Sequence, residues 1–196
     1  VYKDCVFVPP LSMFDDVASI ARCGIHSIKT NAIINSKIIS KKLELGPTKC
    51  FNIHVGGDTG NCCSLKVHDS MMKKTDHETY LGDVICSSGR NEKNIASKAN
   101  KGVGAISQIF AMLNQVTLGH FYFETALVMR DSMLISKLVA SSEVWYNITK
   151  TEYQKLENID ETFTGRLLNV QSSVPKESLY IEIGKLTVKF IIKIVR

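Results

Sequence analysis

The sequence contains no apolar run long enough to cross a bilayer, which takes about 18 to 20 residues. In its richest apolar window, residues 105–129, the run is interrupted at Asn114, Gln115, His120 and Glu124. The sequence also has no recognisable signal peptide, no internal repeat and no low-complexity segment. We therefore expect a soluble, folded protein with no membrane partner.

The six cysteines all lie in the first 86 residues and lack the regular spacing of a disulfide framework. Without a secretory signal, such cysteines are typical of free thiols in a reducing compartment. We expect an intracellular protein, in the nucleus or the cytoplasm, and not a secreted one. The sequon Asn147–Thr149 then carries no glycan.

Acidic residues are scarce in two segments, although the whole chain is only mildly basic, with 24 Lys and Arg against 19 Asp and Glu. Residues 29–49 hold five lysines and one acid, and residues 176–196 hold four lysines and Arg196 against two acids. Such segments favour an anionic partner such as nucleic acid, although ordinary solvated faces explain them equally well.

Several common catalytic and metal-binding patterns are missing. No serine lies in a G-x-S-x-G context. The segment Gly56–Gly60 lacks the Lys-Ser/Thr and the helix of a phosphate loop, so it predicts a hairpin turn. Thiolate and imidazole ligands for zinc are present at Cys50, His54, Cys62, Cys63 and His68. Their spacing is not standard and residues 50–54 alternate as a strand, so we expect no zinc site.

The chain length fits one domain or two small lobes. Short apolar runs punctuated by glycines predict strands and turns up to about residue 90, including runs at Val6–Val8 and Val17–Ala21. Within this part, Ile28, Ala32, Ile39 and Leu43 recur at helical spacing and predict an amphipathic helix with a basic outer face. The expected fold class is α+β, with an α+β lobe at 1–90 and an all-helical lobe at 91–196.

The second lobe has helical signals throughout. We expect helices over about 95–113 and 121–144, then one after Thr149, where Thr149 and Glu152 form a capping-box pattern, and a short one over 176–183. The segment 186–195 fits a strand or a helix. Trp145, the only tryptophan, is expected in the core.

Two adjacent carboxylates, Asp15 and Asp16, lie between apolar flanks in the segment Leu11–Ala21. A turn between two short strands would place them outside the hydrophobic layer. Because neighbouring carboxylates repel each other, a hard divalent cation is a common way to keep both ionised. The pair therefore indicates magnesium chemistry beside substrate phosphates, although an ordinary turn explains the same dipeptide.

The order of motifs resembles the second half of a reverse transcriptase domain of the kind found in non-LTR retrotransposons. The matching features are Met13–Asp16, a basic helix, Gly46–Cys50, Tyr80–Gly82 and a helical segment after them. The resemblance implies the end of a polymerase palm over 1–90 and a thumb-like region, truncated at its end, over 91–196. It implies RNA-directed DNA polymerase activity, with an RNA template, a DNA primer and deoxynucleoside triphosphates as partners; the oligomeric state is not defined.

The resemblance also assigns roles to individual residues. Asp15 and Asp16 would hold catalytic Mg²⁺ in a two-metal site, with Asp15 the more direct ligand. Lys49 would neutralise or protonate the pyrophosphate leaving group, and Tyr80, Leu81 and Gly82 would grip the primer end. A last set of lysines would contact the nucleic-acid backbone: Lys37, Lys41 and Lys42.

Two departures from the family pattern limit the expected activity. Phe14 is bulky where the family has a small residue, and the family's other catalytic aspartate and its Gln-Gly segment lie upstream of the hairpin, where Asp4 cannot replace that aspartate. Two-metal transfer needs both sets of carboxylates, so we expect this chain alone to be inactive, as part of a longer parent. The alternatives are a non-catalytic nucleic-acid-binding remnant and a helical protein-interaction module.

Overall fold

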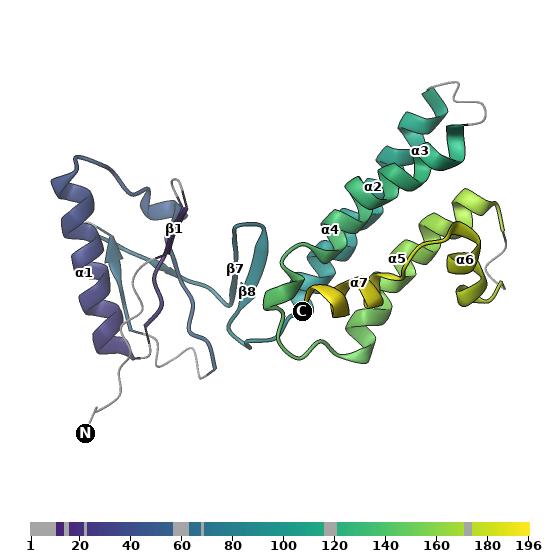
Figure 1. Cartoon of the computed structure of the whole chain (residues 1–196). Coiled ribbons are helices and arrows are strands. Elements are labelled where there is room, and N and C mark those ends of the chain that lie inside the picture. Colours follow the sequence, from purple (N-terminus) through teal and green to yellow (C-terminus); the bar gives the residue numbers. More distant parts are fainter. Residues whose placement is uncertain are drawn as a thin grey trace. The chain divides into compact units, whose positions relative to one another are not determined.

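The computed structural model describes residues 11–13, 16–21, 23–56, 63–67, 69–115, 121–170 and 174–196. The chain divides into two compact units, Val1–Arg90 and Asn91–Arg196. In the described residues, the first unit contains one long helix and short strands, and the second contains only helices (Figure 1). The α+β fold class expected from the sequence is confirmed.

In the described part of the first unit, the strands form four separate two-stranded ladders. β1 (Leu11–Met13) pairs with β2 (Asp16–Ala18), and β7 (His77–Tyr80) pairs with β8 (Asp83–Cys86), both antiparallel. β4 (Lys66–Val67) and β5 (Ser70–Met71) are also antiparallel, whereas β3 (Phe51–Asn52) and β6 (Lys73–Lys74) are parallel. The predicted strand at Val6–Val8 and most of the predicted turn at Gly56–Gly60 lie outside the described residues.

Helix α1 (Gly24–Ser40) confirms the predicted helix, but its orientation differs from the prediction. Ile28 and Ile39, which we expected to face the core, are 51% and 58% exposed, and the buried residue of the helix is Thr30. The predicted apolar face is therefore not buried, although its Ile28 and Ala32 line a groove beside β4 and β5. The outer surface of α1 carries both lysines and isoleucines.

A polar contact explains this orientation of α1. The side-chain amides of Asn31 and Asn35 donate hydrogen bonds to the Lys66 carbonyl oxygen in β4, at 2.7 and 2.9 Å. The two asparagines are four residues apart and lie on one side of the helix, so both reach the same acceptor. This contact holds the side of α1 that carries Asn31 and Asn35 against β4, and Ile28 lies on the same side but stays half exposed.

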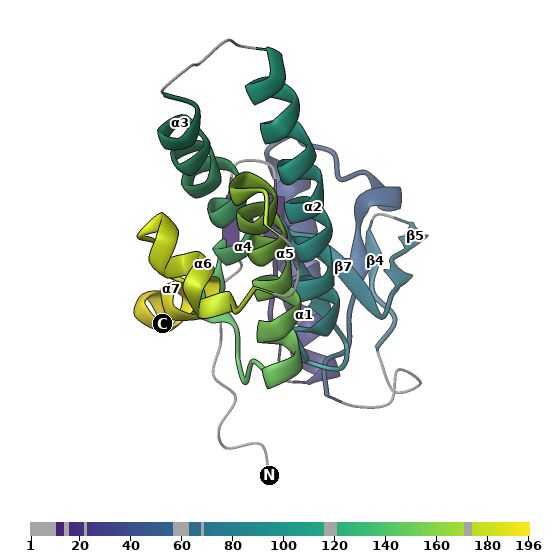
Figure 2. The same ribbon diagram turned by 90° about the vertical axis from the view of Figure 1, so that its right-hand side faces the viewer.

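The helical unit begins with α2 (Glu92–Gln115) and continues with α3 (Tyr122–Met129), the π-helical segment η4 (Arg130–Ile135) and α4 (Ser136–Val139). After the short η5 (Ser142–Val144) come α5 (Lys150–Leu168), α6 (Lys176–Ile183) and α7 (Val188–Val195). Helices α2 and α5 lie side by side in both ribbon views (Figures 1 and 2).

The predicted capping box and the predicted short helix over 176–183 are confirmed in this unit. Thr149 and Glu152 form the complete capping box of α5. Pro175 precedes α6, and Gly184 ends it with a φ of 61°, a value that suits glycine. The segment 186–195, which fitted either element, is helical in α7.

One hydrophobic core joins the helices of the second unit. Phe110 of α2 and Phe163 of α5 lie in contact, with ring centroids 5.4 Å apart, and Trp145 is only 2% exposed, as predicted. Gly102 allows close helix packing, because a Cβ at this position would lie 2.7 Å from Leu138 Cδ2 and 3.0 Å from Ile159 Cγ2.

A buried polar network fastens α6 and α7 to this core. Arg130 donates two hydrogen bonds to the Asp160 carboxylate, at 2.8 and 2.7 Å, and one to the Leu186 carbonyl oxygen at 3.1 Å. The Tyr180 hydroxyl donates to the same carboxylate at 2.9 Å. At the edge of the network, Lys185 pairs with Asp131. Every charge in the buried pair has a partner, which is the condition for burying an ion pair without a large cost.

Burial and charge act together on the titrating groups of this network. Burial raises the pKa of Tyr180 far above its usual range, and the Asp160 carboxylate raises it further. For Arg130, burial alone would lower the pKa, but the hydrogen bond and the charge of Asp160 outweigh it and the net shift is upward. Arg130 therefore stays charged and Tyr180 stays protonated.

Among the described residues, no helix has the length and apolar character that spanning a membrane would require.

Candidate functional site

Asp16 belongs to a pair of antiparallel strands, β1 and β2. In the β1–β2 ladder, Met13 is opposite Asp16 and Ser12 is opposite Val17. Asp16 is therefore the first residue of a strand, and only Phe14 and Asp15 separate the innermost paired positions. Asp15 itself and the side chain of Asp16 lie outside the described residues, so their predicted role in metal binding stays a prediction.

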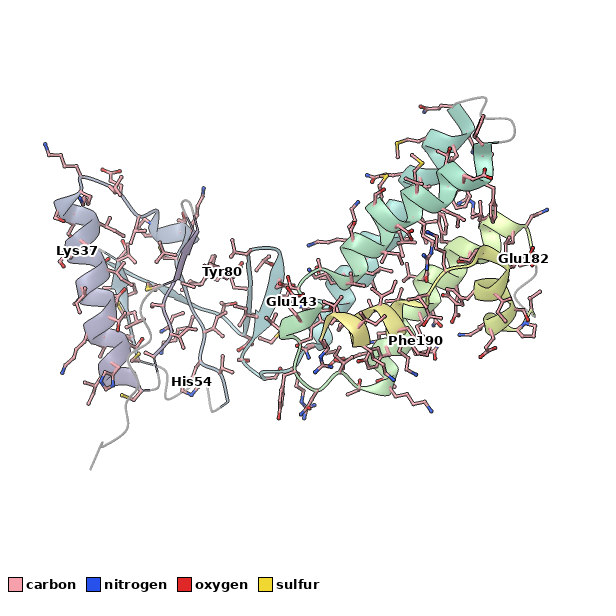
Figure 3. All side chains as sticks on the ribbon, in the orientation of Figure 1. Lys37, His54, Tyr80, Glu143, Glu182 and Phe190 are labelled. Atoms are coloured by element: carbon pink, nitrogen blue, oxygen red, sulfur yellow. The ribbon has the colours of Figure 1, made fainter. Side chains whose placement is uncertain are left out.

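The basic residues assigned to the nucleic-acid backbone lie on or directly after α1. Lys37 is in the last turn of the helix, and Lys41 and Lys42 follow it; all three are exposed. Figure 3 shows Lys37 on this helix. Their ammonium groups are placed on solvent-facing surface, where a polyanion could reach them.

Lys49 lies in a separate short helical turn, η1 (Pro47–Lys49), that follows Gly46. Its side chain is exposed, and the turn leads directly into strand β3 through Cys50. The sequence pattern Gly46–Cys50 thus forms a defined turn whose last helical residue is a lysine.

The Tyr80–Gly82 motif forms the tip of the β7–β8 hairpin, where Tyr80 pairs with Asp83. Leu81 and Gly82 are the two turn residues, and both have positive φ, 49° and 85°. A two-residue turn with this geometry favours Asn-Gly, because an ordinary side chain in the left-handed region costs about 1–2 kcal/mol. Leu81 is nevertheless a leucine and is 48% exposed.

A leucine at such a position marks a strained tip. Strain at an exposed position is not compensated by burial of the side chain, and strained backbone of this kind occurs often at functional sites. Figure 3 shows Tyr80 on this hairpin.

The outer face of α2 is a surface that the sequence reading did not single out. Besides Lys93, Lys101 and Val103, its exposed residues include a row of small or neutral polar ones: Asn100, Gly104, Ser107, Gln108 and Ala111. At 24 residues, α2 is about 36 Å long. From Lys93 to Phe123 the sequence contains no Asp or Glu, and this lack of acid was the signal that could have revealed the surface.

This α2 face suits close approach by a polyanion. Gly104 has no atom within 4 Å of the place where a Cβ would be, so the backbone of α2 is accessible there. Neutral polar side chains can hydrogen-bond to sugars and phosphates without charge repulsion.

A shallow groove of about 340 Å³ lies between α1 and the β4–β5 hairpin. Apolar atoms of Ile28, Ala32, Leu65 and Met71 line it together with the asparagine row. The Asn35 Oδ1 atom is buried and has no hydrogen-bond partner. None of the predicted site residues lines this groove.

The cysteine and histidine residues do not converge on a metal site in the described part of the chain. No group of three or more His, Cys, Asp or Glu side chains comes together there. Cys23 Sγ lies 3.0 Å from His26 Nδ1, and Cys63 packs beside Gly24. Burial raises the pKa of the Cys50 thiol, which makes it a poorer ligand and nucleophile. Cys62 and His68 lie outside the described residues.

Comparisons with protein-family models, with curated proteins and with solved structures give no match for this chain. We therefore infer its function from the chemistry and geometry of its residues.

Proposed function

We propose that the chain is the C-terminal part of a reverse transcriptase palm followed by its thumb. In the complete enzyme, this part would contribute two carboxylates to a two-metal site that copies RNA into DNA. The observation that carries the proposal is the antiparallel strand pairing that includes Asp16, which lies opposite Met13. A hairpin of this kind can present adjacent carboxylates to Mg²⁺ and to the phosphates of a nucleotide.

Two further features support the proposal. The strained tip at Leu81 offers an exposed apolar side chain that could pack on a sugar of the primer end. The acid-free outer face of α2 could follow the backbone of a template–primer duplex.

In this proposal each group has a defined task. Asp15 and Asp16 bind the metal ions, which activate the primer 3′-hydroxyl and stabilise the leaving oxygen. Lys49 would neutralise the departing pyrophosphate, and Lys37, Lys41 and Lys42 would bind phosphates by charge. The upstream aspartate that completes such a site is expected in a longer parent, so the 196-residue chain would bind template–primer without extending it.

The first experiment measures binding of a fluorescent RNA–DNA template–primer by anisotropy over a range of salt concentrations. We expect affinity that falls steeply with salt, because bound lysines release counterions from the duplex. Gly104→Glu should weaken binding at least about tenfold, because it places a negative charge on the α2 face.

Gly165→Glu is the matched control for that variant. Gly165 is also a helical glycine with no atom within 4 Å of its Cβ position, but it lies in α5. Equal losses for the two variants would contradict a specific role of the α2 face. No measurable duplex binding at low salt would reject the proposal and would favour a helical protein-interaction module.

A non-catalytic nucleic-acid-binding remnant is the other candidate, favoured by the exposed lysines of α1. This candidate predicts the same salt-dependent binding of template–primer as the polymerase proposal. It differs in one prediction: Asp15→Ala and Asp16→Ala leave DNA synthesis by a longer parent unchanged.

A further inference from the structure

The outer face of α7 carries an exposed aromatic ring beside cations. We define the α7 surface as Phe190, Lys193, Ile194 and Arg196. The helix is anchored from its other side by Val188 and Ile192, which are completely buried, and Thr187 caps its first turn. This anchoring holds Phe190 outward, where it is 56% exposed (Figure 3).

The charge of this region is positive. From Ile183 to Arg196 the sequence contains four cations and no acid. Lys185 is paired with Asp131, and Lys189 acts on the nearby Glu157 carboxylate. Among the described residues, Lys193 and Arg196 form no ion pair. Two elements that contact α7 carry carboxylates nearby: α5, with Glu157 beside Lys189, and η5, with the exposed Glu143.

The ring and a cation of the α7 surface are direct neighbours. Lys193 Nζ lies 5.9 Å from the centroid of the Phe190 ring. An exposed aromatic face next to an ammonium group suits a nucleotide, whose base can stack on the ring while its phosphate meets the cation. A second copy of this surface would be repelled by its own charge, and a duplex hides the faces of its bases.

We propose that the α7 surface binds single-stranded nucleic acid by stacking a base on Phe190 and holding its phosphates at Lys193 and Arg196. If the chain is the polymerase part proposed above, this strand is an unpaired stretch of the RNA template. The binding site itself depends only on α7 and is distinct from the α2 face that would contact the duplex.

The experiment compares the affinity of the full 196-residue chain for a fluorescein-labelled 15-nucleotide single-stranded RNA across Phe190 variants. Because a base stacked on an aromatic ring contributes strongly to single-strand affinity, Phe190→Leu should weaken binding about tenfold and Phe190→Trp should preserve it. Lys193→Gln should lower the slope of log affinity against log salt by about 0.7, the value for one contact to a single strand.

Phe121→Leu is the matched control. Phe121 is exposed at the start of α3, and no cation lies over its ring among the described residues. We expect the affinity of the Phe121→Leu variant for the single strand to remain within twofold of that of the unchanged chain. Circular dichroism of each variant should confirm that the helices are retained.

Three results would overturn the inference. One is equal affinity of Phe190→Leu and the unchanged chain, which would identify the surface as a docking site for an apolar or acidic protein segment. Another is an equal loss for Phe121→Leu. The last is an absence of single-strand binding at low salt.

The same measurements separate this inference from the proposed function. Phe190→Leu should leave the affinity for a blunt-ended RNA–DNA duplex unchanged, whereas Gly104→Glu should reduce it. If the unchanged chain binds the single strand but not the duplex, the polymerase proposal alone is rejected. If it binds the duplex but not the single strand, only the α7 site is rejected.

Discussion

Gly102 and Gly104 of α2 provide a sharp test of the packing, because alanine should have opposite effects at these two neighbouring positions. At Gly104 a Cβ meets no atom within 4 Å, so alanine gains its helix preference of about 1 kcal/mol without a steric cost. At Gly102 the Cβ would lie 2.7 Å from Leu138 Cδ2 and 3.0 Å from Ile159 Cγ2.

The cost at Gly102 should exceed the gain. Leu138 is completely buried and cannot move freely, and overpacking of a core typically costs about 1–3 kcal/mol. After subtracting the helix preference of about 1 kcal/mol, we expect a net loss of about 1 kcal/mol for Gly102→Ala. The two variants should therefore differ by about 2 kcal/mol, with opposite signs relative to the unchanged chain.

Trp145 makes the measurement specific for the helical unit. It is the only tryptophan in the chain and is buried in the core of that unit, so its fluorescence reports unfolding there and not in the strand-containing unit. In thermal unfolding, 1 kcal/mol shifts the midpoint of a unit of this size by about 4 °C. A higher midpoint for Gly102→Ala, or a lower one for Gly104→Ala, would refute the packing of α2 against α4 and α5.

Further variants test the strained tip and the buried network. Leu81→Asn should relieve about 1 kcal/mol of backbone strain, and amide hydrogen exchange in β7 and β8 should slow about fivefold; unchanged exchange would show that Leu81 is not strained. Asp160→Asn leaves the buried Arg130 with only the partly exposed Asp131 as its counter-charge, and urea unfolding should show a loss of about 3 kcal/mol, whereas a loss below about 1 kcal/mol would contradict the buried pair. The raised pKa of Tyr180 in the folded state means that stability is complete below the unfolded pKa of about 10 and falls as pH rises above it. Tyr180→Phe should be less stable at neutral pH but lose this alkaline slope, and an unchanged slope would exclude Tyr180 as its source.

Local signals made the helical unit largely predictable. The capping box at Thr149, Pro175 before α6 and Gly184 after it each act within a few residues, so the sequence alone defines these helix ends. The π-helical segment η4 had no comparable signal. It places Arg130 against Asp160, a partner 30 residues later in the sequence.

Long-range contacts explain what the sequence did not reveal in the strand-containing unit. The face of α1 was misread because apolar periodicity was taken as the burial signal. The deciding contact joins Asn31 and Asn35 to a carbonyl oxygen more than 30 residues away. The hairpin tip at Leu81-Gly82 also lacks the usual Asn-Gly signal.

In the candidate site, too, local sequence signals were predictive and long-range packing was not. The strand pairing that includes Asp16 could be inferred from the apolar flanks of the aspartate pair, whereas the strand predicted at Val6–Val8 lies outside the described residues. The α2 and α7 surfaces could not be found by motif, since both are defined by which side of a helix the core covers. In each case the sequence signal was a long interval without an acid.

The most direct test of the polymerase proposal is primer extension on an RNA template. The protein tested is a longer parent chain that includes the residues encoded upstream of Val1. The account predicts magnesium-dependent DNA synthesis that Asp15→Ala or Asp16→Ala abolishes, with template–primer affinity retained. Undiminished synthesis by both variants would contradict it.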